Sequence, residues 1–219
     1  MMLTLPIDHV VLLVPDLARA GAAFESAGFH VTAKASHSPA MGTANRCVML
    51  DGTYIELMGI ETETPANLAW RRLLEKGQGI RGLAFRSEDI QSSGQSLTQA
   101  GIGIEPARHF SRETPYGELR FSVVRIDPVA TPGLQCLACQ HHTPDRLWLA
   151  DSMRHGNGAT GLASVDIPVV TGLDRLAAAF GGGGIAVSSG DGRLVLTGSA
   201  PAHYDLRDAC GIVIDMVSR

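Results

Sequence analysis

The feature that most constrains the fold of this chain is an internal repeat. The segment Ile7–Phe29 (IDHVVLLVPDLARAGAAFESAGF) aligns without gaps with Ile80–Ile102 (IRGLAFRSEDIQSSGQSLTQAGI), 73 residues further on. In each copy an apolar run precedes an aspartate, and a helical stretch then ends at an Ala-Gly pair. Since each copy must fold into the same supersecondary unit, the repeat largely decides the architecture.

Each copy predicts a strand, a helix and then three strands. Asp16 and Asp89 stand where helix N-caps belong, and Gly28 and Gly101 stand where each helix ends. The β-like segments that follow are residues 29–33, 46–50 and 54–60 in the first copy, and residues 102–105, 118–126 and 134–139 in the second. The sequence therefore predicts two βαβββ modules.

A weaker third copy fills the rest of the chain. It reads as a strand over residues 161–169, a helix over 173–180, a hairpin of 185–189 with 193–198, and a last strand over 210–218. We predict an α+β fold of tandem βαβββ modules over residues 1–78 and 79–157, two of them forming a cup, and a third, divergent module over 158–219. The alternative is an α+β sandwich in which the similarity is accidental, but caps that align without gaps argue against it.

Composition excludes some partners. The chain has 219 residues, 45% of them hydrophobic and 18% charged, with a formal net charge of −4 and no basic stripe. We therefore expect no nucleic acid or anionic membrane partner. Asp8 and Asp16 bracket the apolar run Val10–Val14, so we predict a buried strand rather than a signal peptide or membrane span, and a cytoplasmic location.

Strand alternation selects the residues that face the cup. His9 lies on the first predicted strand and Glu56 on the last strand of the first copy. At the Glu56 position we place Gln135 in the second copy, 79 residues further on, and Asp215 in the third. Gly82 stands at the His9 position of the second copy, where it offers no ligand atom but leaves room for a substrate.

Five motifs carry a resemblance to a known family. They are IDHVVLLVPDL, His37 followed by GTANR, YIELMGI, QHHTPDRLW and HGNGA. With its tandem modules, a histidine on the first strand and a glutamate on the last, the chain resembles the vicinal oxygen chelate superfamily, and more closely its glyoxalase-like branch. The resemblance covers most of the chain and implies the glyoxalase/dihydroxybiphenyl dioxygenase-like fold.

The resemblance also implies a divalent metal ion in the cup. Carried over by position, the metal ligands are His9 and Glu56, which suit Zn²⁺, Fe²⁺ or Mn²⁺, and Gln135 could add an amide oxygen. Gly82 departs from the four-ligand pattern of the superfamily. The alternative is a hydrogen-bonded His9–Glu56 pair that lines a metal-free pocket.

Substrate-binding candidates lie in and after the loop SHSPAMG. His37 belongs to this loop, Asn45 could orient a carbonyl, and Arg46 could bind a carboxylate or phosphate through its bidentate fork. The alternative is that Asn45 caps a turn and Arg46 is a solvated charge at a sheet edge. Gln135 completes the predicted substrate-binding set.

Histidines also follow the last strand of the second copy. Because imidazole titrates near neutral pH, His141 is the candidate catalytic base, together with Glu56. The alternative is that one of His141 and His142 is exposed while the other packs near Trp148. His155 is expected to shape the glycine-rich turn that leads into the third copy.

Two further motifs are given structural interpretations. Cys136 and Cys139 form a C-x-x-C, but their segment GLQCLACQH is a strand pattern, on which residues three apart face opposite sides. We therefore predict small buried side chains rather than a zinc or redox pair. The run Gly181–Ala186 follows a predicted helix instead of opening one, so no nucleotide cofactor is expected.

The resemblance implies a metal-dependent lyase, isomerase or dioxygenase that acts on a small oxygen-rich metabolite. The alternative is a non-catalytic protein of the same fold that binds a small molecule without metal. We also expect a homodimer, because the third module has no partner within the chain to cover its open face.

Overall fold

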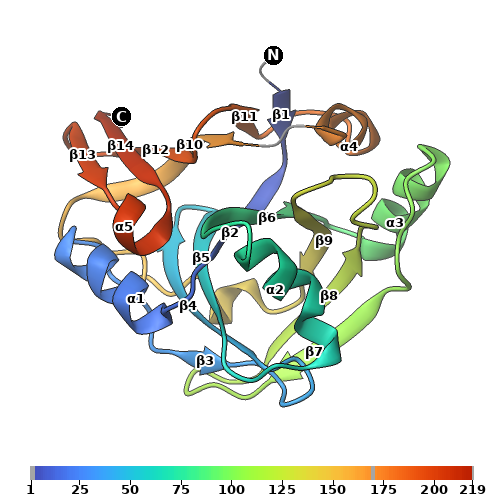
Figure 1. Cartoon of the computed structure of the whole chain (residues 1–219), viewed down its shortest axis with the longest axis horizontal. Helices are drawn as coiled ribbons and strands as arrows, with labels where there is room; N and C mark the ends of the chain where they lie inside the picture. The colour runs from blue at the N-terminus through green and yellow to red at the C-terminus, as the bar shows by residue number, and fades with distance from the viewer. Residues whose placement is uncertain (1–2, 169–170, 219) are drawn as a thin grey trace.

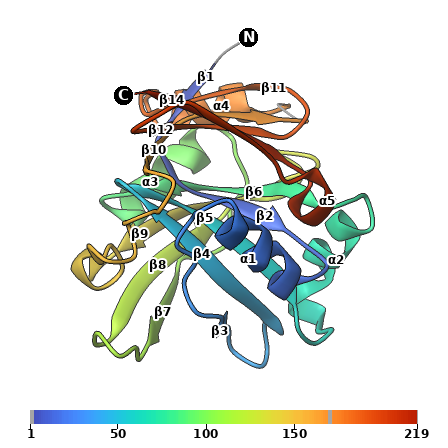
Figure 2. The same ribbon diagram turned by 90° about the vertical axis from the view of Figure 1, so that its left-hand side faces the viewer.

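The computed structural model describes residues 3–168 and 171–218 and contains two sheets. The larger has the order β3-β4-β5-β2-β6-β9-β8-β7 and the smaller β1-β11-β10-β12-β14-β13. Figure 2 shows the smaller sheet as a separate layer above the larger one, whose outer strands run down on both sides. Among the helices of the described residues, none has the length and apolarity to cross a membrane.

The strands and helices have these bounds. The eight-stranded sheet contains β2 (Ile7–Leu13), β3 (Ala35–Ser36), β4 (Thr43–Leu50), β5 (Thr53–Ile60), β6 (Gly79–Arg86), β7 (Arg108–Arg112), β8 (Leu119–Arg125) and β9 (Gln135–His141). The six-stranded sheet contains β1 (Leu3–Leu5), β10 (Ala159–Ile167), β11 (Ile185–Ser189), β12 (Arg193–Gly198), β13 (Ala202–Asp205) and β14 (Val213–Ser218). The helices are α1 (Leu17–Ser26), α2 (Leu68–Leu74), α3 (Ile90–Gln99), α4 (Leu173–Ala179) and α5 (Arg207–Cys210), with 3-10 turns η1 (Pro65–Asn67) and η2 (Pro144–Arg146). Figure 1 labels the helices and strands.

The two predicted βαβββ modules are confirmed. In the first, β2 runs parallel to β5, which pairs antiparallel with β4. In the second, β6 runs parallel to β9, which pairs antiparallel with β8. The predicted caps are also present, because Asp16 accepts from a backbone N–H in α1 and Asp89 accepts from two in α3. Gly28 and Gly101 follow the helices with positive φ values of 83° and 69°.

The modules join through β2 and β6 with the symmetry that the sequence repeat requires. These strands are antiparallel, and Ile7 pairs with Phe85 while Leu12 pairs with Ile80. A shift of 73 residues converts one pair into the other, so a local two-fold axis relates the two modules. The offset is thereby confirmed, and Gly82 is the structural equivalent of His9.

The strand after each helix begins later than predicted. Residues 29–33 pack Phe29 and Val31 into the core. The backbone N–H of Thr32 donates to the Cys47 carbonyl on β4, but this segment is not assigned as a strand. In the second module, Ile104 makes a single bridge before β7 begins. The second strand of the first module is therefore β3 and that of the second module is β7, and these two strands form the edges of the eight-stranded sheet.

The third segment keeps the predicted order of elements but pairs them differently. β10 lies between β11 and β12, so the predicted hairpin of residues 185–189 with 193–198 is wrong. Helix α4 carries the chain across the sheet, and β11 therefore returns parallel to β10. Val169, the last residue of the predicted strand, lies outside the described residues. The boundaries at 78/79 and 157/158 stay predictions.

The six-stranded sheet covers the back of the eight-stranded sheet. Its inward residues, among them Val165, Leu194 and Ile214, join one core with Val10 and Leu57 of the larger sheet. Its apolar face is thus buried within the same chain, which removes our reason for expecting a homodimer; the homodimer itself stays a prediction. The opposite, concave face of the larger sheet remains free for a site.

Asp215 does not face the cup, contrary to the sequence-based placement. It lies on the outer face of the six-stranded sheet, where it forms ion pairs with Arg193 and His203. The similarity of the last strands in sequence therefore does not extend to a shared position in space.

His155 lies in the segment between β9 and β10, and it bonds this segment to the first module. Its Nδ1 accepts from the His30 N–H at 3.0 Å, and its Nε2 donates to the Met49 carbonyl at 2.8 Å. Burial lowers the pKa of His155, an effect that the hydrogen bond to Met49 partly opposes. The folded state therefore favours the neutral imidazole.

Replacing His155 with glutamine is expected to lower stability by about 1–3 kcal/mol, since buried backbone groups lose a partner. Because the folded pKa lies below the unfolded value of about 6.5, the wild type loses stability as the pH falls through that value. The variant should lose less over the same range. Denaturation at several pH values, with His203→Gln as control, measures this. If wild type and His155→Gln lost stability equally as the pH falls, the role given to His155 would be contradicted.

Candidate functional site

The concave face of the eight-stranded sheet encloses a cavity of about 300 Å³. Both modules contribute to its walls, and α2 adds Trp70. The first module supplies His9, Val11, His37, Met41, Asn45, Tyr54, Glu56 and Met58. The second supplies Phe121, Arg112, Arg125, Gln135, Leu137, Cys139 and His141. Most of the predicted polar residues therefore meet in one place.

A β-bulge brings Asp8 beside His9. The register of β2 against β6 shifts between Ile7 and His9, so Asp8 is the extra residue on its strand. Asp8 is fully buried, and its Oδ1 lies 2.7 Å from His9 Nδ1 and 3.0 Å from His141 Nε2. One buried carboxylate thus positions two cavity histidines.

The surroundings of Asp8 keep it ionised. Burial alone would raise its pKa, but hydrogen bonds from His141 and His9 lower the pKa well below the usual range. Arg86 adds a further cation, 3.4 Å from Oδ2. An ionised carboxylate only accepts hydrogen bonds, so His9 donates from Nδ1 and His141 from Nε2. Lone pairs therefore remain on His9 Nε2 and His141 Nδ1.

The sequence patterns did not select Asp8 as a site residue. One indication was present, since Asp8 is a charged residue in an apolar strand directly before His9. Strict alternation placed it on the opposite face from His9, and the bulge that changes this leaves no clear mark in the sequence.

Glu56 lies between His9 and His37 of the first module. Its Oε2 is 3.6 Å from His9 Nε2, and its Oε1 is 3.9 Å from His37 Nε2. Asn45 donates from Nδ2 to Oε1 at 2.7 Å, which orients the carboxylate. Tyr54 stacks on the His9 ring at a centroid distance of 4.4 Å. The structure therefore brings the predicted residues His9, His37, Asn45 and Glu56 together in the cavity.

These groups fit a divalent metal ion. Histidine ligands of metal ions commonly donate their second ring N–H to a carboxylate, as His9 does to Asp8. The free Nε2 of His9 then points toward Glu56, and His37 offers a second imidazole close by. Imidazole nitrogen and carboxylate oxygen suit Zn²⁺, Fe²⁺ and Mn²⁺.

The second module offers no matching ligands. In the first module Val11 pairs with Glu56, and the equivalent of Val11 in the second module, Ala84, pairs with Leu137. Leu137 therefore occupies the Glu56 position, and our placement of Gln135 there was wrong by two residues. Gln135, which pairs with Gly82, still lines the cavity at the position of Tyr54.

Gly82 leaves room for the side chain of Trp70. The expectation that it leaves room for a substrate is therefore wrong. A Cβ atom at this position would lie 2.9 Å from the ring of Trp70, 3.0 Å from Val11 Cβ and 3.1 Å from the carbonyl oxygen of Gln135. Trp70 thus fills the space that a second metal-binding histidine would occupy.

Replacing Gly82 with alanine is expected to destabilise the protein by about 1–3 kcal/mol, because strand and ring must move apart. Gly94→Ala in α3 is the control. Its nearest contact would be 3.4 Å, from Ile104, and alanine favours the helix, so its stability should stay level or rise. Chemical denaturation compares the two, and a Gly82 variant as stable as wild type would contradict the packing described.

Arg46 lies on the wrong face of the sheet for the predicted role. Its guanidinium forms an ion pair with Glu25 of α1 and donates from Nε to the Thr32 carbonyl at 2.9 Å. Neighbours on a strand face opposite sides, so Asn45 in the cavity requires Arg46 outside it. We therefore propose no ligand contact for Arg46.

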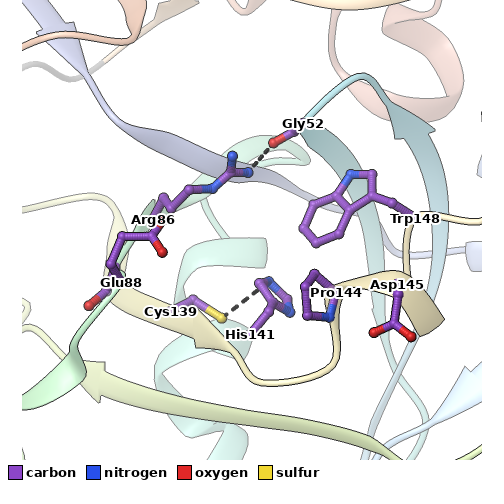
Figure 3. A pocket seen from close by; sticks show the side chains of 9 residues that line it. Gly52, Arg86, Glu88, Cys139, His141, Pro144, Asp145 and Trp148 are labelled. Carbon is purple, nitrogen blue, oxygen red and sulfur yellow. Dashed lines mark hydrogen bonds between the residues drawn. The ribbon is translucent and has the colours of Figure 1, made fainter.

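A second pocket shares Cys139 and His141 with the cavity. Figure 3 shows Cys139 beside His141, with Arg86 bonded to the Gly52 carbonyl. The His141 ring lies 5.0 Å from the Trp148 ring and His142 is exposed, which is the arrangement given above as the alternative to a catalytic base. His142 instead bonds Ser122.

Cys139 belongs to a possible second ligand group. Ligand atoms of Asp8, Cys139 and His141 all lie within 4.8 Å of one another. As predicted, the two cysteines of the C-x-x-C motif face opposite sides, since Cys136 packs in the core behind the sheet. Burial raises the pKa of Cys139 well above its usual value, which disfavours the thiolate that metal binding needs.

Comparison with known proteins identifies the family. Residues 7–181 match the family described as a glyoxalase-like domain. The chain belongs to the glyoxalase-like domain family. The resemblance of its motifs to the glyoxalase-like branch is thus confirmed over most of its length. No curated protein matches the chain.

Two solved structures illustrate what the chain is similar to. A hypothetical protein from Staphylococcus aureus is 11% identical, with a TM-score of 0.73 over 97% of this chain and 98% of its own. A methylmalonyl-CoA epimerase from Mycobacterium tuberculosis is 21% identical, with a TM-score of 0.49 over 63% of this chain and 89% of its own. The first likeness extends through the third segment as well as the two modules.

Proposed function

We propose that this glyoxalase-like protein is a metal-dependent enzyme in which His9 and Glu56, together with His37, bind a divalent ion. The substrate is a small oxygen-rich metabolite in the cavity. The observation that carries the proposal is the hydrogen bond from His9 Nδ1 to Asp8, which leaves Nε2 directed at Glu56. When bound, the ion would supply a Lewis acid for neighbouring substrate oxygens.

The protein's own groups favour proton transfer. Asp8 accepts the Nε2–H of His141, so His141 Nδ1 has a lone pair that can accept a proton. The ionised Asp8 would then stabilise the imidazolium that forms. Asn45 fixes the Glu56 carboxylate, and the Tyr54 ring stacks on His9. Among the three reaction types, a lyase or isomerase makes most use of these groups.

Elemental analysis tests the metal site. Untagged protein purified without chelator should contain close to one divalent ion per chain, and His9→Ala should contain none. His203→Ala is the matched control, since this exposed histidine pairs with Asp215 far from the cavity. Wild-type protein without metal, even after exposure to Zn²⁺, Mn²⁺ and Fe²⁺, would refute the proposed mechanism.

A metal-free binding protein is the second candidate. It is favoured by Gly82 and Leu137, which leave the second module without ligands where the first has His9 and Glu56. In that case His9 and Glu56 would contact the ligand directly. Tight ligand binding without turnover in metal-free protein would support this candidate.

A further inference from the structure

The cavity wall formed by the second module carries arginines without acidic partners. Arg112 ends β7 and Arg125 ends β8, and both line the cavity. Within residues 3–168 and 171–218, neither forms an ion pair with a carboxylate, and the Nε of Arg112 is buried without a hydrogen-bond partner. Unpaired cations in an enclosed site are costly to bury, so their retention calls for an anion.

Arg125 reaches across the cavity to the first module. Its Nη2 lies 3.7 Å from Met41 Sδ, a weak acceptor that provides no charge. Burial lowers the pKa of Arg125, and the charge of Glu105 partly opposes this effect. The Glu105 carboxylate is itself bonded to Arg108 at 2.8 Å.

Arg112 lies at the other end of the same wall. It pairs with Leu119, the first residue of β8, whereas Arg125 is the last residue of that strand. Within the described residues, Glu56 of the facing module has only histidines as ion-pair partners, so it does not neutralise Arg112.

The charges of the cavity do not balance. Glu56 is the one acidic residue among those that line it in the described chain. Of the three lining arginines, Arg120 lies 3.8 Å from Glu118, which leaves Arg112 and Arg125 in excess. The remaining wall is mostly apolar, with Val11, Met58, Trp70, Phe121 and Leu137.

We propose that the cavity binds a small organic acid. Its carboxylate would form charge-assisted hydrogen bonds with one of these two arginines, which lie at opposite ends of the wall. Its apolar body would contact the apolar wall and extend toward His9 and Glu56. This substrate class deepens the proposed function, on which it rests for taking this cavity as the active site.

Matched acids and amides test the proposal. Benzoate and phenylacetate are compared with benzamide and phenylacetamide, which have the same shape without the charge. Calorimetric titration of metal-free protein should give at least roughly tenfold tighter binding for each acid than for its amide. Equal binding of acid and amide, or no binding of either acid at millimolar concentration, would overturn it. So would tighter binding of inorganic phosphate than of both acids.

Variants locate the effect in the cavity. Either Arg112→Gln or Arg125→Gln should weaken benzoate binding by roughly tenfold or more, and both should leave benzamide binding unchanged. Arg193→Gln, on the outer face of the six-stranded sheet, is the control. Unchanged benzoate affinity in both cavity variants would contradict the inference. Repeating the titration with His9→Ala separates it from the metal proposal, because acid binding should persist there.

Discussion

Replacing Asp8 with asparagine is expected to weaken divalent-metal binding by about 10- to 100-fold. The carboxylate accepts from His9 Nδ1 and so fixes the tautomer that exposes Nε2 toward Glu56. An amide is uncharged and can place its NH₂ group against the ring, which removes this preference. Titration of metal-free protein with Zn²⁺ measures the change.

The same substitution is expected to destabilise the metal-free protein by about 3 kcal/mol, because Arg86 and two histidines lose one buried counter-charge. Arg86 remains partly exposed, which places the loss at the lower end for buried pairs. Asp89→Asn is the control, since asparagine also caps helices well. An Asp8 variant with unchanged stability and metal affinity would contradict the role given to this carboxylate.

Asp8 also makes wild-type stability sensitive to acid. Its folded pKa is lowered by His141 and His9 despite the opposing effect of burial. The stabilisation is therefore complete above the unfolded value of about 3.9 and is lost as the pH falls below it toward the folded pKa. The Asp8→Asn variant should lose less stability than wild type over that acidic range.

Replacing Glu56 with glutamine is expected to abolish metal binding while leaving the fold intact. The amide oxygen of glutamine can still accept from Asn45, but it carries no charge for the ion. In metal-free protein the change removes a buried carboxylate that has no cation at hydrogen-bonding distance, so stability should stay within about 1 kcal/mol of wild type or rise.

The metal content of the purified protein measures the first effect of Glu56→Gln. Thermal denaturation of metal-free protein measures the second. Glu61→Gln is the matched control, because it lies just beyond β5 and pairs with Lys34 at the surface. Retention of the metal with unchanged affinity would contradict the role of Glu56 as a ligand.

Local sequence patterns predicted the two modules well. Asp16 and Gly28 bound one helix and Asp89 and Gly101 the other, and such caps depend on residues close in sequence. The third segment was harder, because its strand order depends on where α4 crosses the sheet. That choice is made by packing against the back of the larger sheet, which no local motif encodes.

The site was predicted in part. His9, Glu56, His37 and Asn45 follow from alternation and motif position, and they do meet in the cavity. Alternation could also have excluded Arg46, since it neighbours Asn45 on the same strand.

Other parts of the site depend on register. Asp8 enters through a bulge, and Leu137 replaces Gln135 at the Glu56 position because the loops between strands differ in length between the modules. Arg112 and Arg125 come from strands whose partners across the cavity are distant in sequence. Pairing at this distance becomes visible only when the strands are placed in space.

The central claim is that His9 and Glu56 bind the metal ion, and anomalous X-ray diffraction from crystals soaked in Zn²⁺ tests it most directly. The account predicts a strong peak about 2.0–2.2 Å from both His9 Nε2 and a Glu56 carboxylate oxygen. A peak among Asp8, Cys139 and His141 instead, or no peak in the cavity, would contradict it.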